Sequence, residues 1–109
     1  MQEVATQEEF LRALAGCPAV LALFGGTRCT VCTAIRPKID ALCASAFPRL
    51  KTLYVDCERT PDIPAQLGIL SVPVAVAFFE GRETVRLIRT FGMSELADAL
   101  QRPYQLFFD

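Results

Sequence analysis

The sequence predicts an α/β protein with a mixed central β-sheet of about four or five strands and helices on both faces, in the order βαβαβαββα. Strand-like apolar runs alternate with segments of helical spacing along most of the 109 residues, as in parallel strands joined by helices. Residues 19–24 are apolar without interruption, which is typical of a strand buried on both faces. The last two strand candidates are separated by a short turn, which indicates an antiparallel hairpin.

The N-terminal part predicts a weak strand over residues 2–5 and then a helix. Thr6 and Glu9 have capping-box spacing, so the Thr6 hydroxyl can accept from the Glu9 amide while the Glu9 carboxylate reaches back. Apolar residues at helical spacing follow, and Gly16 and Pro18 end the helix before the central strand.

The middle of the chain alternates helix and strand. Helical spacing begins at Thr30 and runs to about residue 46, with Pro37 inside it, where the missing backbone donor should kink the helix. Residues 50–56 form the next strand candidate. Pro61 then opens a short helix that ends near Gly68.

The C-terminal part predicts strands over residues 74–79 and 84–90 around a turn at 80–82. A last helix starts at Ser94, and Pro103 should close it. Residues 103–109 would then form an apolar tail, packed on the domain's own surface or used for a partner or a dimer contact. No repeat or linker divides the sequence, so we expect one domain over residues 1–109, as a monomer or weak dimer.

The composition excludes several chemistries from this chain. There is no histidine, so it has no Ser-His-Asp or Cys-His nucleophile pair and no mixed Cys/His zinc site. A formal net charge of −1 and the lack of a basic stripe argue against nucleic acid and membrane partners. The acidic N-terminus does not resemble a signal peptide, so we expect a soluble cytoplasmic protein. A secreted chain whose signal had been removed would look the same.

The main chemical motif is Cys29-Thr30-Val31-Cys32, which follows the buried strand and Gly25-Gly26 at the start of a helix. Two thiols three residues apart can close a small disulfide ring. The free amides and positive dipole end of the helix, together with neighbouring Arg28, should favour a thiolate on Cys29. Cys29 is therefore the predicted nucleophile, and Cys32, one turn further in, is the predicted resolving thiol.

These residues resemble the thioredoxin family from about Val4 to Leu100. The matched features are the buried strand, the cysteine pair, the proline five residues after it, the Val-Pro dipeptide before the hairpin, the hairpin turn and a glycine after the last strand. In this chain the last four are Pro37, Val72-Pro73, Phe78-Phe79-Glu80-Gly81 and Gly92.

The resemblance implies a thioredoxin fold and a thiol-disulfide oxidoreductase whose clients are disulfide-containing proteins. Pro73 would be cis and lie against Cys29, and the Val72 backbone would pair with an extended client segment. An apolar rim would surround the disulfide, formed by Val31, Val72, Phe91 and Met93, next to Gly92. A flavoprotein disulfide reductase or a small thiol would restore the dithiol, and neither a metal nor a cofactor other than the disulfide is expected.

The chain also departs from the family pattern. Arg28, Thr30 and Val31 replace the usual Trp, Gly and Pro around the cysteines. Leu23 stands in place of a buried aspartate beneath the second cysteine, and Thr52 in place of its lysine partner. Attack by Cys32 should therefore be slow or depend on water. Arg28 and the missing proline should favour the reduced form, which would make the couple more oxidising than a typical thioredoxin.

Other interpretations of the cysteines stay open. The protein could be a binding or assembly module of thioredoxin fold whose thiols are inert. A metal site that adds Cys43 and Cys57 to the pair lacks the second close pair of a four-cysteine zinc site. Cys17, Cys43 and Cys57 are more typical of small buried hydrophobic residues, and Cys57 is the first candidate among them for regulatory oxidation or glutathionylation.

Overall fold

The computed structural model describes residues 1–109, and its five strands and four helices follow the expected order. The elements are β1 Gln2–Val4, α1 Gln7–Gly16, β2 Ala19–Gly25, α2 Thr30–Ala46, β3 Lys51–Asp56, α3 Asp62–Leu67, β4 Val74–Phe79, β5 Arg82–Ile88 and α4 Met93–Phe108. The strands form one sheet in the order β1-β3-β2-β4-β5. β1, β3 and β2 are parallel, whereas β4 is antiparallel to both β2 and β5. The predicted α/β fold with a mixed sheet is confirmed.

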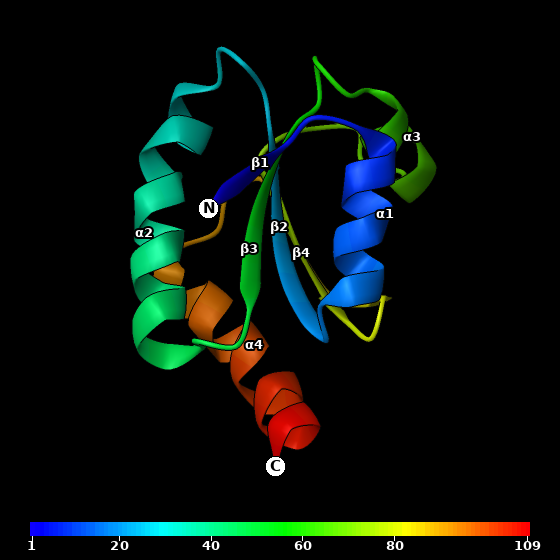
Figure 1. The fold of residues 1–109 in the computed structure, drawn as a ribbon. Helices are drawn as coiled ribbons and strands as arrows, with labels where there is room; N and C mark the ends of the chain where they lie inside the picture. The colour runs from blue at the N-terminus through cyan, green and yellow to red at the C-terminus, as the bar shows by residue number, and fades with distance from the viewer.

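Two helical layers enclose the sheet, with α2 and α4 on one face and α1 and α3 on the other (Figure 1). Alternation along β2 decides which side chain enters which layer. Leu21 and Leu23 belong to the apolar cluster under α2 and α4, whereas Val20 and Phe24 belong to the cluster under α1 and α3. All four are at most 1% exposed, so the central strand is buried on both faces as predicted.

The start of α1 confirms the capping interaction. Thr6 is the N-cap, and its hydroxyl accepts from the Glu9 amide at 3.1 Å. The Glu9 carboxylate reaches back one residue further than the standard box and accepts from the Ala5 amide at 3.3 Å. This cap fixes where the chain leaves β1 and enters the helical layer.

The β4–β5 hairpin is tighter than predicted. Phe79 pairs with Arg82, so the loop contains only Glu80 and Gly81, whose φ angles of 52° and 77° are both positive. Two positive φ angles are characteristic of the turn that matches the twist of paired strands. β5 therefore begins at Arg82, two residues before the expected start, and ends at Ile88 instead of reaching residue 90.

The prediction that Pro103 closes the last helix is wrong, because α4 continues through it to Phe108. Residues 103–109 are consequently not a separate tail. Proline removes one helical hydrogen bond, but the turns after it present aromatic residues to the domain. The ring of Tyr104 lies 5.1 Å from that of Phe47, and the ring of Phe107 lies 5.4 Å from that of Phe79. Burial of these rings favours continuation of the helix.

No helix in the structure has both the length and the apolar character needed to cross a membrane.

Candidate active site

Cys29 and Cys32 form a disulfide where the chain passes from β2 into α2. Their Cα atoms are 5.2 Å apart. Cys29 is the N-cap of α2 and is half-buried, and its Sγ accepts from the Cys32 amide at 3.2 Å. Cys32 lies inside the first turn and is completely buried. The outer sulfur is thus the one that a client can reach, and it already has a helix N-terminal donor.

A groove of about 360 Å³ lies beside the cysteine motif. Its lining comes from three places in the chain: Val31 and Ile35 of α2, Val72 and Pro73 before β4, and Arg89, Thr90 and Phe91 after β5. The Val72–Pro73 peptide bond is cis. The fold therefore brings the motif, the Val-Pro dipeptide and Phe91 to one surface, although they are far apart in sequence.

The backbone on one side of Pro73 is hydrogen-bonded within the sheet, whereas the backbone on its other side, at Val72, is free. The Arg89 amide donates to the Pro73 carbonyl at 2.7 Å and extends the β4–β5 ladder by one residue. Val72 lies outside the strand, and neither its N–H nor its C=O makes a hydrogen bond within the protein. A free donor and acceptor at a sheet end can pair with an extended segment of another chain.

The structure groups most, but not all, of the predicted site residues. Cys29, Val72, Phe91 and Met93 pack against the same apolar cluster, which contains Cys32. Gly92 is the N-cap of α4. The remaining residues, Arg28 and Thr30, are exposed beside Cys29 and do not line the groove.

Tyr54 is a neighbour of Cys32 that the sequence analysis missed. It pairs with Leu23 in the β2–β3 register, and its hydroxyl donates to the Gly26 carbonyl at 3.0 Å. A Cβ on Gly25 would collide with this hydroxyl and come within 2.9 Å of the Cys32 Sγ, so both atoms border the same point. Burial raises the pKa of Tyr54, which keeps the hydroxyl protonated as a donor.

Leu23 occupies the position at which the family pattern has a buried aspartate. Leu23 is fully buried and apolar. The nearby Asp56 carboxylate accepts from the Thr27 hydroxyl at 2.5 Å and from the Glu58 amide at 3.0 Å, so it holds the loop after β3. The Tyr54 hydroxyl borders the same point as the Cys32 Sγ and is a polar neighbour of this thiol.

Comparison with known proteins decides the family, because the thioredoxin family model matches residues 1–102. The chain belongs to the thioredoxin family. Among curated thioredoxins, that of Chlamydia trachomatis is 31% identical over 88 residues, which are 81% of this chain and 84% of that protein. The thioredoxin-like protein YdfQ of Bacillus subtilis is 28% identical over 79 residues, 72% of this chain and 70% of the relative.

Solved thioredoxin structures share the fold. Fasciola hepatica thioredoxin superposes with a TM-score of 0.84 at 21% identity, over 94% of this chain and 98% of that one. Plasmodium falciparum thioredoxin gives a TM-score of 0.79 at 19% identity, over 98% and 99% of the two chains. Identities this low support the fold alone.

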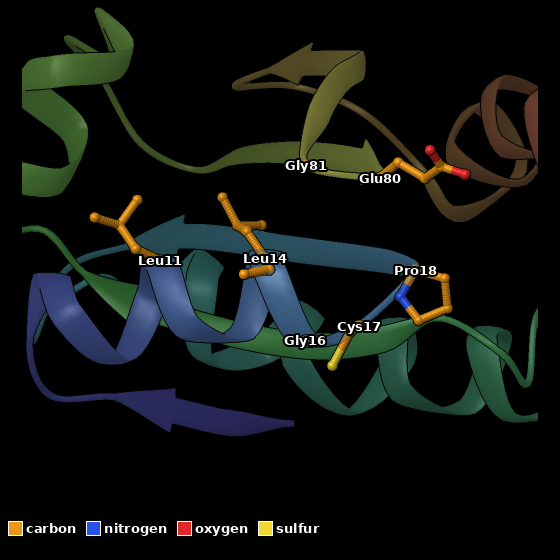
Figure 2. A pocket seen from close by; sticks show the side chains of 8 residues that line it. Leu11, Leu14, Gly16, Cys17, Pro18, Glu80 and Gly81 are labelled. Atoms are coloured by element: carbon orange, nitrogen blue, oxygen red, sulfur yellow. The ribbon is translucent and has the colours of Figure 1, made fainter.

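The largest hollow on this thioredoxin-family protein lies away from the disulfide. It measures about 660 Å³ and is formed by the end of α1, the residues before β2 and the β4–β5 turn. Leu11 and Leu14 point toward that turn, whereas the Cys17 sulfur points away from it (Figure 2). This hollow is at the amino end of β2, and the disulfide follows the carboxyl end. The smaller groove is therefore the candidate site.

The other three cysteines are free thiols. Burial, followed by the charge of Asp40, raises the pKa of the Cys43 thiol to about 11. Burial, followed by the charges of Asp56 and Glu58, raises the pKa of Cys57 to about 11. Such thiols carry little thiolate at neutral pH. These pKa values make Cys43 and Cys57 weak nucleophiles, and the choice of half-buried Cys57 for regulatory oxidation stays a prediction.

Alkylation kinetics test this assignment of Cys57. We expect native Cys57 to react at least about 10-fold more slowly at pH 7.5 than an exposed thiol, because its raised pKa lowers the thiolate fraction by more than it raises the nucleophilicity of each thiolate. The rate should climb with pH until about pH 11, where the folded thiol ionises. Mass spectrometry of iodoacetamide-labelled peptides gives the rate, and protein in urea is the control. Equal rates in native and unfolded protein would contradict the assignment.

Gly25 should be intolerant of a side chain. Alanine at this position places its methyl group against the Tyr54 hydroxyl and the Cys32 sulfur. We expect Gly25→Ala to lower the free energy of unfolding by about 1–3 kcal/mol. Urea denaturation measures the loss. Gly16→Ala is the matched control, because a Cβ there meets no atom within 4 Å. Equal stability of the two variants would show that the point beside Gly25 is not crowded.

Proposed function

We propose that this protein is a thiol-disulfide oxidoreductase in which Cys29 is the nucleophile and Cys32 the resolving thiol. The observation that carries the proposal is the disulfide at the N-terminus of α2, with a half-buried Cys29 Sγ that accepts from the Cys32 amide. The helix N-terminus stabilises negative charge on the sulfur of the reduced protein.

The exchange has two steps that balance in atoms and electrons. The Cys29 thiolate attacks one sulfur of a client disulfide, so a mixed disulfide forms and the other client sulfur leaves as a thiolate that takes up a proton. Cys32 loses its proton to water and attacks the Cys29 Sγ, which closes the Cys29–Cys32 disulfide and releases the second client thiolate. The client gains two electrons, and the protein loses two.

Client binding would use the groove beside the motif. The free backbone groups of Val72 would pair with an extended client segment, and Val31, Phe91 and Pro73 would cover its side chains. The groove is open to solvent and not an enclosed cavity, so it suits an extended polypeptide better than a small molecule.

A second reaction must return the dithiol, because each client consumes two electrons. A flavoprotein disulfide reductase or a small thiol supplies them, and the protein itself needs no further cofactor. The presence of three free cysteines fits a reducing compartment, and we propose the cytoplasm.

The test is reduction of insulin driven by dithiothreitol, followed by turbidity of the released chain. We expect the wild-type protein to exceed the rate with dithiothreitol alone and Cys29→Ser to equal it, because the nucleophile is gone. Cys43→Ser, which removes a buried free thiol, is the control and should retain the wild-type rate. A wild-type rate equal to that of Cys29→Ser would refute the proposal.

A binding or assembly module is the second candidate. It is favoured by Leu23, which is fully buried where the family has an acid that can take the Cys32 proton. A module of this kind would bind its partner equally well with Cys29 or with serine at this position. The same Cys29→Ser variant, assayed for partner binding and for turnover, separates the two functions.

A further inference from the structure

Arg89 has an unusual backbone conformation at the edge of the groove. Its φ is 63°, in the left-handed region that glycine and asparagine adopt easily and arginine rarely does. Its amide is fixed to the Pro73 carbonyl at 2.7 Å, directly after the last residue of β5. Residues held in such conformations gather at binding sites. The arginine side chain at this position therefore calls for a functional explanation.

Arg89 is also the only charged residue of the groove. It is exposed, and the other lining residues are apolar apart from Thr90. The four ion pairs of the protein use the Met1 amino group, Arg36, Arg59 and Arg86, so Arg89 has no carboxylate partner. The groove thus combines an apolar surface with one free positive charge.

We propose that Arg89 selects clients that carry an acidic residue close to the disulfide that is reduced. This inference rests on the proposed oxidoreductase function and names its substrate class: extended polypeptide segments with Asp or Glu beside the reactive cysteine. The guanidinium forms a charge-assisted pair with the client carboxylate, for which its two parallel N–H groups are well suited.

The backbone arrangement explains why the acidic residue must be close. Val72 offers its unpaired N–H and C=O to the client, and Arg89 is hydrogen-bonded to the adjacent Pro73. A segment that pairs with Val72 therefore runs beside Arg89. Residues of an extended segment are about 3.3 Å apart, so the arginine side chain reaches a carboxylate about two residues from the client cysteine.

Binding of redox-inert peptides tests the selection without turnover. The peptides are a matched series in which serine replaces the reactive cysteine and the residue two positions away, on either side, is Glu, Gln or Lys. Titration of the oxidised protein, followed by amide NMR shifts of Thr90 and Phe91, gives the Kd of each. We expect the Glu peptide to bind about five-fold more tightly than the Gln peptide, and the Lys peptide most weakly. The preference should decrease with added salt.

Variants of Arg89 assign the preference to this side chain. Arg89→Lys should keep it, whereas Arg89→Gln and Arg89→Gly should bind all three peptides equally. Glycine suits the positive φ, so that variant removes the charge without backbone strain. Arg12→Gln on α1, across the sheet, makes the same change in net charge and should keep the preference.

The outcomes separate this inference from the proposed function. Equal affinities for the Glu and Lys peptides in the wild-type protein, or a preference that persists in Arg89→Gly, would overturn the selection by Arg89. The corresponding cysteine-containing disulfide peptides are then assayed for reduction. A charge preference in binding without any reduction would refute the oxidoreductase function and support the assignment of Arg89 as a recognition residue.

Discussion

Replacement of Cys32 by serine is expected to reduce turnover at least about 100-fold and to leave the client covalently attached to Cys29. The first step needs only the outer thiolate, which keeps its place at the N-cap of α2. The second step needs a thiol inside the first turn, and serine cannot supply it.

Non-reducing electrophoresis and mass spectrometry detect the trapped species. The adduct of Cys32→Ser should contain one client molecule, joined through Cys29, and dithiothreitol should release it. The double variant Cys29→Ser/Cys32→Ser should form no adduct, since the remaining cysteines include two thiols with pKa values raised to about 11. Adducts through Cys17, or no adduct at all, would be incompatible with the assigned roles.

Removal of residues 103–109 is expected to lower the free energy of unfolding by about 3–5 kcal/mol. The deletion takes away three half-buried aromatic rings, those of Tyr104, Phe107 and Phe108. It also removes the Tyr104 hydroxyl that accepts from the Arg49 amide at 3.1 Å and the ring of Phe108, over which the Arg49 guanidinium lies at 5.0 Å. A loss of this size is a large part of the stability of a small domain.

Urea denaturation of the truncated and full-length proteins measures this contribution. Leu106→Ala is the control within the same segment, because Leu106 is 67% exposed and should contribute less than about 0.5 kcal/mol. If the truncated protein were as stable as the full-length one, residues 103–109 would act as the dispensable tail that the sequence suggested, and the aromatic contacts would contribute nothing.

Local patterns predicted the fold because they repeat over many residues. The uninterrupted run of β2 and the helical spacing of α2 each identify an element without knowledge of the rest. The prediction for the last turns of α4 is wrong because they depend on contacts with residues far away in the sequence. The local rule at Pro103 is outweighed by contacts with Phe47 and Phe79, which are more than twenty residues away in sequence.

The candidate site likewise contains residues that short motifs predict and residues that only the tertiary structure brings to the site. The cysteine pair and Val72-Pro73 are short motifs: the roles of Cys29 and Cys32 were predicted from their place at the start of a helix, and those of Val72 and Pro73 from the family resemblance. Tyr54 and Arg89 could not be found in this way. Tyr54 lies beside Cys32 because β3 pairs with β2 in one register, and Arg89 enters the groove because the tight hairpin ends β5 at Ile88. The expectation of a more oxidising couple stays a prediction.

A single-turnover exchange between the reduced protein and a disulfide peptide tests the central claim most directly. Samples are quenched with acid, alkylated and analysed by mass spectrometry for the state of every cysteine. We predict that two peptide thiols appear for each Cys29–Cys32 disulfide that forms, while Cys17, Cys43 and Cys57 stay reduced. A peptide that remains oxidised, or oxidation of other cysteines in its place, would contradict the assignment of this disulfide as the reactive centre.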